Sequence, residues 1–215
     1  MSNETTNPVV KWILIGICVI IVLGAVLVFV LKTCPDDYQV ARELHARGFA
    51  VAYEHWDDSQ IWKRPTFIFV EDKSITPEDS RLICQLPYMF SIDFSRCDMS
   101  GWNLDEIGNC QRLHDLIFLD VVNFPAEEIE KLAACSARSI ILRNAHLKDS
   151  DLEHFAGLTK LSLLDLQDNA GITDAGLEHI EKMSSLRSLD IKGTSVTQEG
   201  IEEFKKKRPD IEVSY

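Results

Sequence analysis

The sequence predicts an α/β solenoid in which short parallel strands form one face and helices form the other. The repeating unit is visible in residues 161–180, which read LSLLDLQDNAGITDAGLEHI. Its first part has the Leu-x-Leu alternation that ends at Leu166 and is typical of a strand with one buried face. Asn169 and Gly171 then indicate a turn, and apolar residues at helical spacing follow from Leu177 onward. A unit this small cannot bury its own apolar side chains, so it needs neighbours of the same shape.

The same template recurs on both sides of this stretch at a nearly constant spacing. The other copies cover residues 66–82, 89–104, 113–129, 137–152 and 186–201. The last buried residue of each expected strand falls at position 70, 94, 118, 142, 166 or 191, so the spacings are 24, 24, 24, 24 and 25 residues. This regularity predicts about six repeats of 24–25 residues, each contributing one strand to a single sheet.

The period and the pattern L-x-x-L-x-L-x-x-(N/C/T) are typical of leucine-rich repeats. Residues 66–215 resemble the cysteine-containing subclass of these repeats, whose copies often read ITDAGL, as residues 172–177 do. Residues 41–53 resemble the helix-plus-strand cap of bacterial membrane-anchored members. The resemblance implies a short right-handed horseshoe with a parallel sheet on its concave face and helices on its convex face. It does not imply one function, because such folds serve many unrelated binding tasks.

The N-terminal part of the chain predicts a membrane anchor. Residues 12–31 are twenty apolar residues without a charge, bracketed by Lys11 and Lys32. At about 1.5 Å per residue they match the roughly 30 Å hydrocarbon core of a bilayer. We therefore expect a short segment 1–11, a single transmembrane helix, a juxtamembrane helix and cap over 32–65, and the repeat domain over 66–215. The flanking charges and the short N-terminal segment point to opposite orientations, so the side on which the repeats lie stays open.

The charge of the chain disfavours nucleic acid as a partner. The formal net charge is −12, and residues 33–215 carry 20 basic and 33 acidic residues, which gives −13. Such a domain is repelled by phosphates and anionic headgroups. The basic run KKKR at 205–208 is expected to end the last helix and to complement its dipole.

No motif in the sequence points to a cofactor, a metal or a catalytic site. Cys97, Cys110 and Cys135 fit interior or turn positions of the template, and Cys84 lies on the adjoining apolar run LICQL. A disulfide between Cys110 and Cys135 is an alternative that stacking of adjacent repeats leaves open. His154 and His179 occupy matching helix positions, which favours surface histidines over metal ligands. No nucleophile elbow or phosphate-binding glycine loop is present. We therefore expect neither enzymatic activity nor a small-molecule substrate.

The template also predicts which side chains point away from the core on the concave face. Several apolar residues fall at positions that the fold does not require to be apolar, with charged residues beside them. The aliphatic preference of parallel strands is the competing explanation. The predicted protein-binding residues are Ile117, Leu119, Ile141, Leu163, Arg143 and Asp165. The sequence therefore favours a single-pass membrane protein whose repeats bind another protein. The alternatives are a structural envelope or scaffold component without a discrete partner site, and an accessory subunit of a membrane enzyme complex.

Overall fold

The computed structural model describes residues 36–55, 63–86, 89–104, 112–134 and 136–215, which share one eight-stranded sheet. Its strands follow chain order from β1 to β8; β1 pairs antiparallel with β2, and every later pair is parallel. The predicted α/β solenoid with an open, mostly parallel sheet is therefore confirmed. Within the described ranges no helix is long and apolar enough to cross a membrane, and the predicted span 12–31 lies outside them.

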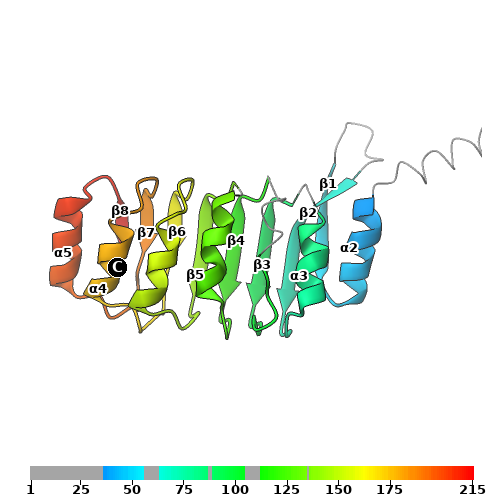
Figure 1. Cartoon of the computed structure of the whole chain (residues 1–215), viewed down its shortest axis with the longest axis horizontal. Helices are drawn as coiled ribbons and strands as arrows, with labels where there is room; N and C mark the ends of the chain where they lie inside the picture. The colour runs from blue at the N-terminus through cyan, green and yellow to red at the C-terminus, as the bar shows by residue number, and fades with distance from the viewer. Residues whose placement is uncertain (1–35, 56–62, 87–88, 105–111, 135) are drawn as a thin grey trace, which may run out of the picture.

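The repeats place their strands in one layer and their helices in a second layer on one side of it (Figure 1). The strands are β1 (Ala50–His55), β2 (Lys63–Glu71), β3 (Ser91–Ser95), β4 (Asp115–Leu119), β5 (Ser139–Arg143), β6 (Leu163–Asp165), β7 (Ser188–Asp190) and β8 (Glu212–Ser214). The helices are α2 (Asp36–Ala46), α3 (Pro77–Cys84), α4 (Asp174–Ile180) and α5 (Gln198–Lys207), with the 3₁₀ helices η2 (Ala126–Ala134) and η3 (Asp149–Phe155). The 3₁₀ form is the tighter helix that proteins use in short connecting segments.

The core lies between these two layers and runs the whole length of the stack. Leu164 and Leu166 are fully buried, and Leu177 from the following helix is 3% exposed, as the template predicts. The buried cluster is continuous from Leu44 to Ile211. Because each repeat packs only against its neighbours, every internal strand depends on both adjoining repeats for burial.

Asn169 shows why the turn after a strand needs a small polar residue. Its side-chain oxygen accepts hydrogen bonds from the backbone N–H groups of Ala145 and Leu147, at 3.0 Å each. Its amide nitrogen donates to the carbonyls of Leu142 and Leu166, at 2.7 and 2.9 Å. These backbone groups face the interior, where an unpaired polar group is costly. Asn169 therefore joins two consecutive turns in one buried network.

The ITDAGL sequence has a structural explanation at the start of α4. Thr173 is the N-cap, and its hydroxyl accepts from the N–H of Ala175. The N–H and hydroxyl of Thr173 both donate to the Asp149 carboxylate of the preceding repeat, at 2.8 and 2.7 Å. A Cβ at Gly176 would lie 2.5 Å from the same carboxylate, so only glycine leaves room for it. Asp174 repeats the arrangement by accepting from Thr197 of the next repeat, at 2.7 Å for both bonds.

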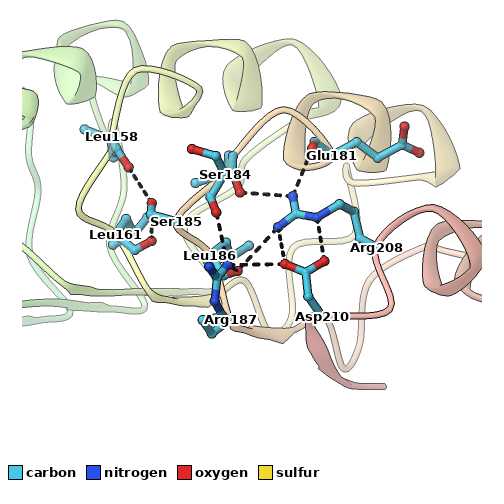
Figure 2. A network of polar contacts seen from close by, with 10 residues as sticks. Leu158, Leu161, Glu181, Ser184, Ser185, Leu186, Arg187, Arg208 and Asp210 are labelled. Atoms are coloured by element: carbon cyan, nitrogen blue, oxygen red, sulfur yellow. Dashed lines mark hydrogen bonds and ion pairs between the residues drawn. The ribbon is translucent and has the colours of Figure 1, made fainter.

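Each end of the stack is closed by an arginine. At the N-terminal end, Arg47 follows α2 and pairs at 3.2 Å with Asp79 of α3, whose side chain is wholly buried. At the C-terminal end, the guanidinium of Arg208 donates to the backbone carbonyls of Glu181 and Met183, at 2.9 and 3.0 Å (Figure 2). It also pairs with Asp210 at 2.9 Å.

The C-terminal contacts refine the prediction for the basic run 205–208. Its last residue caps the end of the preceding helix, α4, and not only its own helix. The adjacent Lys207 pairs with Glu181 of the preceding repeat at 3.0 Å. Both cations therefore tie the last repeat to its neighbour.

Candidate protein-binding surface

The sheet side that faces away from the helices is the candidate binding surface, and we call it the open face. Alternate residues of each strand point toward it because successive side chains in a strand point to opposite sides. The strand register aligns these residues in rows that cross the stack. The middle row from β2 to β7 is Phe69, Asp93, Ile117, Ile141, Asp165 and Asp190.

The register brings the predicted apolar residues together near the middle of this face. Ile117 of β4 is directly opposite Ile141 of β5, and Leu119 is opposite Arg143. Leu163 of β6 lies one strand further along, opposite Ser139. All four apolar side chains are half-buried, so part of each remains open to solvent. Their part in binding a protein stays a prediction.

The structure corrects the expected exposure of Asp165. Although it belongs to an outward-facing row, Asp165 is only 5% exposed. The Arg143 guanidinium covers its carboxylate, with Nη2 and Nε at 2.6 and 2.8 Å from Oδ2, and the backbone N–H of Gln167 donates to Oδ1 at 3.0 Å. The hydrogen bond to Asp165 raises the pKa of Arg143. Arg143 is thus the charged side chain that a partner meets at this point, while Asp165 holds it in place.

An aromatic patch near the N-terminal end of the open face was not singled out from the sequence. We define it as Phe67, Phe69 and Phe90, which are 43%, 40% and 39% exposed. The rings of Phe67 and Phe90 lie 5.8 Å apart, and Phe90 stacks on His114 at 5.0 Å with an 8° angle between the ring planes. The alternation TFIFV at 66–70 contains the signal, since Phe67 and Phe69 take the outward positions.

Asp93 lies in the same row as Phe69 and Ile117, between their two strands. Burial raises the pKa of its carboxyl group, and the negative charge of Glu71 adds to this, whereas a hydrogen bond from the Ser95 hydroxyl opposes it. Among the described residues, no basic side chain forms an ion pair with Asp93. Arg96, which follows the same strand, is engaged by Glu71 and Asp72.

The remaining polar residues do not assemble a metal site within the described ranges. No three His, Cys, Asp or Glu side chains there are arranged to hold a metal ion. Cys84 and Cys97 are buried free thiols, and burial raises the pKa of Cys97. Cys110 and Cys135, for which a disulfide was left open, lie outside the described residues.

The helix side carries a groove between α4 and α5, which encloses about 320 Å³. Leu177 and Phe204 contribute apolar side chains to its lining, and acidic residues from both helices line the rest. Lys207 bridges Glu181 and Glu203 across it, at 3.0 and 3.3 Å, and the hydrogen bond to Glu181 is the main cause of the raised pKa of Lys207. The groove therefore contains its own internal counter-ion.

Comparison with known proteins gives matches among solved structures alone. No family model matches the sequence, and no curated protein matches it. One similar structure is an internalin of Listeria monocytogenes, with 12% identity, a TM-score of 0.39 and coverage of 68% of this chain. Another is a leucine-rich-repeat protein of Leptospira interrogans, with 15% identity, a TM-score of 0.31 and coverage of 66%. This chain spans about half of each, 52% in both cases.

Proposed function

We propose that this chain is a membrane-anchored leucine-rich-repeat module that binds another protein through the open face and has no catalytic activity of its own. The observation that carries the proposal is the open face itself, where half-buried apolar side chains of β4 to β6 lie on the same side of the sheet as an exposed aromatic patch. Ile117 and Ile141 are adjacent at its centre, and Arg143 lies beside them. An apolar surface with polar residues at its edge is the composition typical of protein interfaces.

The rigidity of the sheet supports this proposal. Parallel strands with buried inner faces hold their outward side chains at fixed spacing, so a partner meets a preformed surface. The side chains of Ile117 and Ile141 would form the centre of the interface, where truncation commonly costs about 2 kcal/mol or more. Arg143 would lie nearer the edge, where a charge affects the association rate and its salt dependence more than the lifetime of the complex.

The test is co-purification of partners from detergent extracts with matched variants of the full chain. Ile117→Ser with Ile141→Ser removes apolar contact area without burying a charge, so the domain should fold while association weakens. The matched control is His154→Ala with His179→Ala on the helix side. Recovery of the same partners in the same yield with the Ile pair, after circular dichroism has verified folding, would exclude this face. If the histidine control loses the copurified partners instead, the interface lies on the helix side.

Two other functions from different classes remain as alternatives. A scaffold component without a discrete partner site would lose no specific partner in any of these variants. An accessory subunit of a membrane enzyme complex would copurify with a catalytic chain, and the Ile pair would then lower the activity of that complex. Turnover by the purified chain alone would contradict the proposed lack of catalysis.

The proposed anchor is residues 12–31, and it can be tested independently of binding. Full-length chain should remain in the membrane pellet after high-salt and carbonate washing, whereas a chain beginning at Thr33 should be released. Release of the full-length chain by carbonate would argue against the anchor. Protease digestion of sealed vesicles, with and without detergent, would then identify the side on which the repeats lie.

A further inference from the structure

Asp93 is a carboxylate in an environment that suits an ion pair. Its neighbours across the sheet are Phe69 on one side and Ile117 on the other, at the spacing of roughly 5 Å between adjacent strands. Apolar neighbours and partial burial remove water from the carboxylate, which disfavours its charged form. The Ser95 hydroxyl donates one hydrogen bond to it at 3.3 Å. A cation placed beside this carboxylate would favour its charged form and so offset the cost of its desolvation.

The other carboxylates in the same row already have such a cation from the chain itself. Asp165 pairs with Arg143 at 2.6 Å, and Asp190 pairs with Lys192 at 3.6 Å. The corresponding cation for Asp93 is not supplied by the described residues, because Arg96 is held by Glu71 and by Asp72, the latter at 2.7 Å. The N-terminal half of the row therefore presents an uncompensated negative charge.

The aromatic patch adds a second kind of interaction beside this charge. Phe69 is 40% exposed and is the direct neighbour of Asp93, while its neighbour on β1 is the small Ala50. Exposed phenyl faces attract ammonium and guanidinium groups through the ring quadrupole. The apolar stem of a lysine or arginine would at the same time cover phenyl surface that is now exposed to water.

We propose that the open face binds a lysine or arginine side chain of a protein partner between Asp93 and Phe69. This inference rests on the proposed function and specifies the chemistry of the partner at the N-terminal half of the same face. The partner residue takes the position that Arg143 and Lys192 take for the other two carboxylates. A second copy of this chain is a poor occupant, because the domain is strongly acidic and Lys207 and Arg208 of its basic run are engaged internally.

The acidic groove between α4 and α5 is a weaker candidate for the same ligand. Lys207 already neutralises two of its carboxylates, Glu181 and Glu203. The groove also lacks the exposed aromatic side chains that accompany Asp93. A cationic ligand bound there would compete with Lys207, and this outcome is distinguishable in the experiment below.

The probe is a library of short random linear peptides, selected on the full chain in lipid nanodiscs after removal of peptides that bind empty nanodiscs. The strongest peptide is resynthesised with citrulline, the neutral analogue of arginine, or norleucine in place of each basic residue. Affinities are then measured for the wild type, Asp93→Asn and Phe69→Ser. The pair Ile117→Ser with Ile141→Ser reports on the rest of the open face, and the pair Glu178→Gln with Glu199→Gln reports on the helix-side groove. Asp190→Asn is the matched control, because its carboxylate has an internal partner. Circular dichroism verifies that each variant is folded.

We expect one basic position in the selected peptides whose neutral replacement weakens binding to wild type by about tenfold. Asp93→Asn should weaken the unmodified peptide to a similar degree and should abolish the difference between charged and neutral peptides. Phe69→Ser should weaken binding of both peptides, and Asp190→Asn should preserve the difference. This pattern would place the cation at Asp93 rather than at a general acidic surface.

Three outcomes would overturn the inference, and they differ in what they say about the proposed function. If binding depends on Ile117 and Ile141 but shows no coupling between the peptide charge and Asp93, the proposed function stands and the cation site does not. If the charge couples to Glu178 or Glu199 in the helix-side groove instead, the cation site at Asp93 is rejected, and the dependence of binding on Ile117 and Ile141 decides the proposed function. If selection yields no peptide that depends on the open face, the cation site is rejected as well.

Discussion

At Asp93, the requirements of binding and of folding oppose each other. Burial and the charge of Glu71 raise the pKa of its carboxyl group above 3.8, so the folded chain holds this proton more tightly than the unfolded chain does. The charged form therefore opposes folding above the folded-state pKa, and the effect vanishes below the unfolded value. Residues that carry such a penalty without structural benefit are often found at functional sites.

We predict that Asp93→Asn raises the melting temperature at neutral pH, because the amide removes an unfavourable buried charge. The gain should be a few tenths of a kcal/mol after solvent screening of this half-exposed position. It should shrink as the pH falls through the raised pKa and should be absent below about pH 3.8. Thermal melts at several pH values provide the measurement. Asp190→Asn removes a carboxylate that pairs with Lys192, so an equal gain there would contradict the explanation.

Asp79 is the opposite case, because the cost of burying its carboxylate is offset by hydrogen bonds and by nearby positive charges. Burial raises the pKa of its carboxyl group, but hydrogen bonds from Thr76 and Arg47 and the charge of Lys73 outweigh this and lower it overall. The side chain of Asp79 links the cap helix α2 to the first repeat through Arg47. Its contribution to stability is therefore present above the unfolded pKa and is lost as the pH falls through the lowered folded pKa.

We predict that Asp79→Asn lowers the free energy of unfolding by about 3 kcal/mol, because it leaves two cations facing a neutral buried group. The control is Glu43→Gln, which removes the exposed partner of the same arginine and should cost less than about 0.5 kcal/mol. Denaturant titration of both variants gives the comparison. Equal losses for the two variants would mean that burial of Asp79 does not determine the strength of the contact.

Side-chain direction could be predicted from the sequence, but side-chain exposure could not. The period of two along each strand places Phe69, Asp165 and Ile117 on the open face, and the structure agrees. Exposure depends on what each neighbour across the sheet covers. Arg143 covers Asp165, whereas Ala50 is too small to cover Phe69, and such pairwise effects need the strand register in three dimensions.

At the level of elements, the contacts at the N-terminus of α4 explain the ITDAGL sequence of that repeat. The strand positions were predictable because buried apolar residues recur every 24 or 25 residues. The strand β8 was not predicted, since its only signal is the alternation of Ile211 and Val213. The contact between Asp149 and Thr173 was also not predictable, because it joins residues 24 positions apart in the chain.

We predict that the effect of Gly176→Ala on the free energy of unfolding depends on the residue at position 149. Alanine normally stabilises a helix by about 1 kcal/mol relative to glycine. Here the added Cβ would meet the Asp149 carboxylate, so the variant should lose about 1 kcal/mol instead. In an Asp149→Ala background, which itself loses the two bonds from Thr173, the same change should cost less, because only the side chains of Leu152 and Ile172, at 3.0 and 3.2 Å from the added Cβ, then have to move. Urea titration of the wild type, the two single variants and the double variant completes the double-mutant cycle. Additive effects of the two changes would exclude the proposed clash.

At the scale of the whole molecule, the described strands form an open sheet in which each strand pairs only with its neighbours in chain order. Its stability is therefore a sum of repeat and neighbour terms, and each end needs a cap. Arg208 provides the C-terminal cap by satisfying carbonyls at the end of α4 and by pairing with Asp210 (Figure 2). The ion pair lowers the pKa of Asp210 to about 2, with the hydrogen bond from Arg208 as its main cause.

We predict that Arg208→Ala loosens the C-terminal repeats before it affects the N-terminal ones. The change leaves the carbonyl of Glu181 without its donor and removes one of the two donors to Met183, which keeps the N–H of Leu186 at 3.3 Å. This should cost about 1–3 kcal/mol locally. Hydrogen exchange followed by mass spectrometry should show faster exchange in α4, α5 and β8, while β3 and β4 keep their protection. The control Lys206→Ala removes an exposed cation from the same helix and should leave exchange unchanged. Because the candidate cation site at Asp93 lies on β3, far along the stack from this cap, peptide binding should survive Arg208→Ala. A uniform rise in exchange across all strands would instead mean that the repeats open as one cooperative unit.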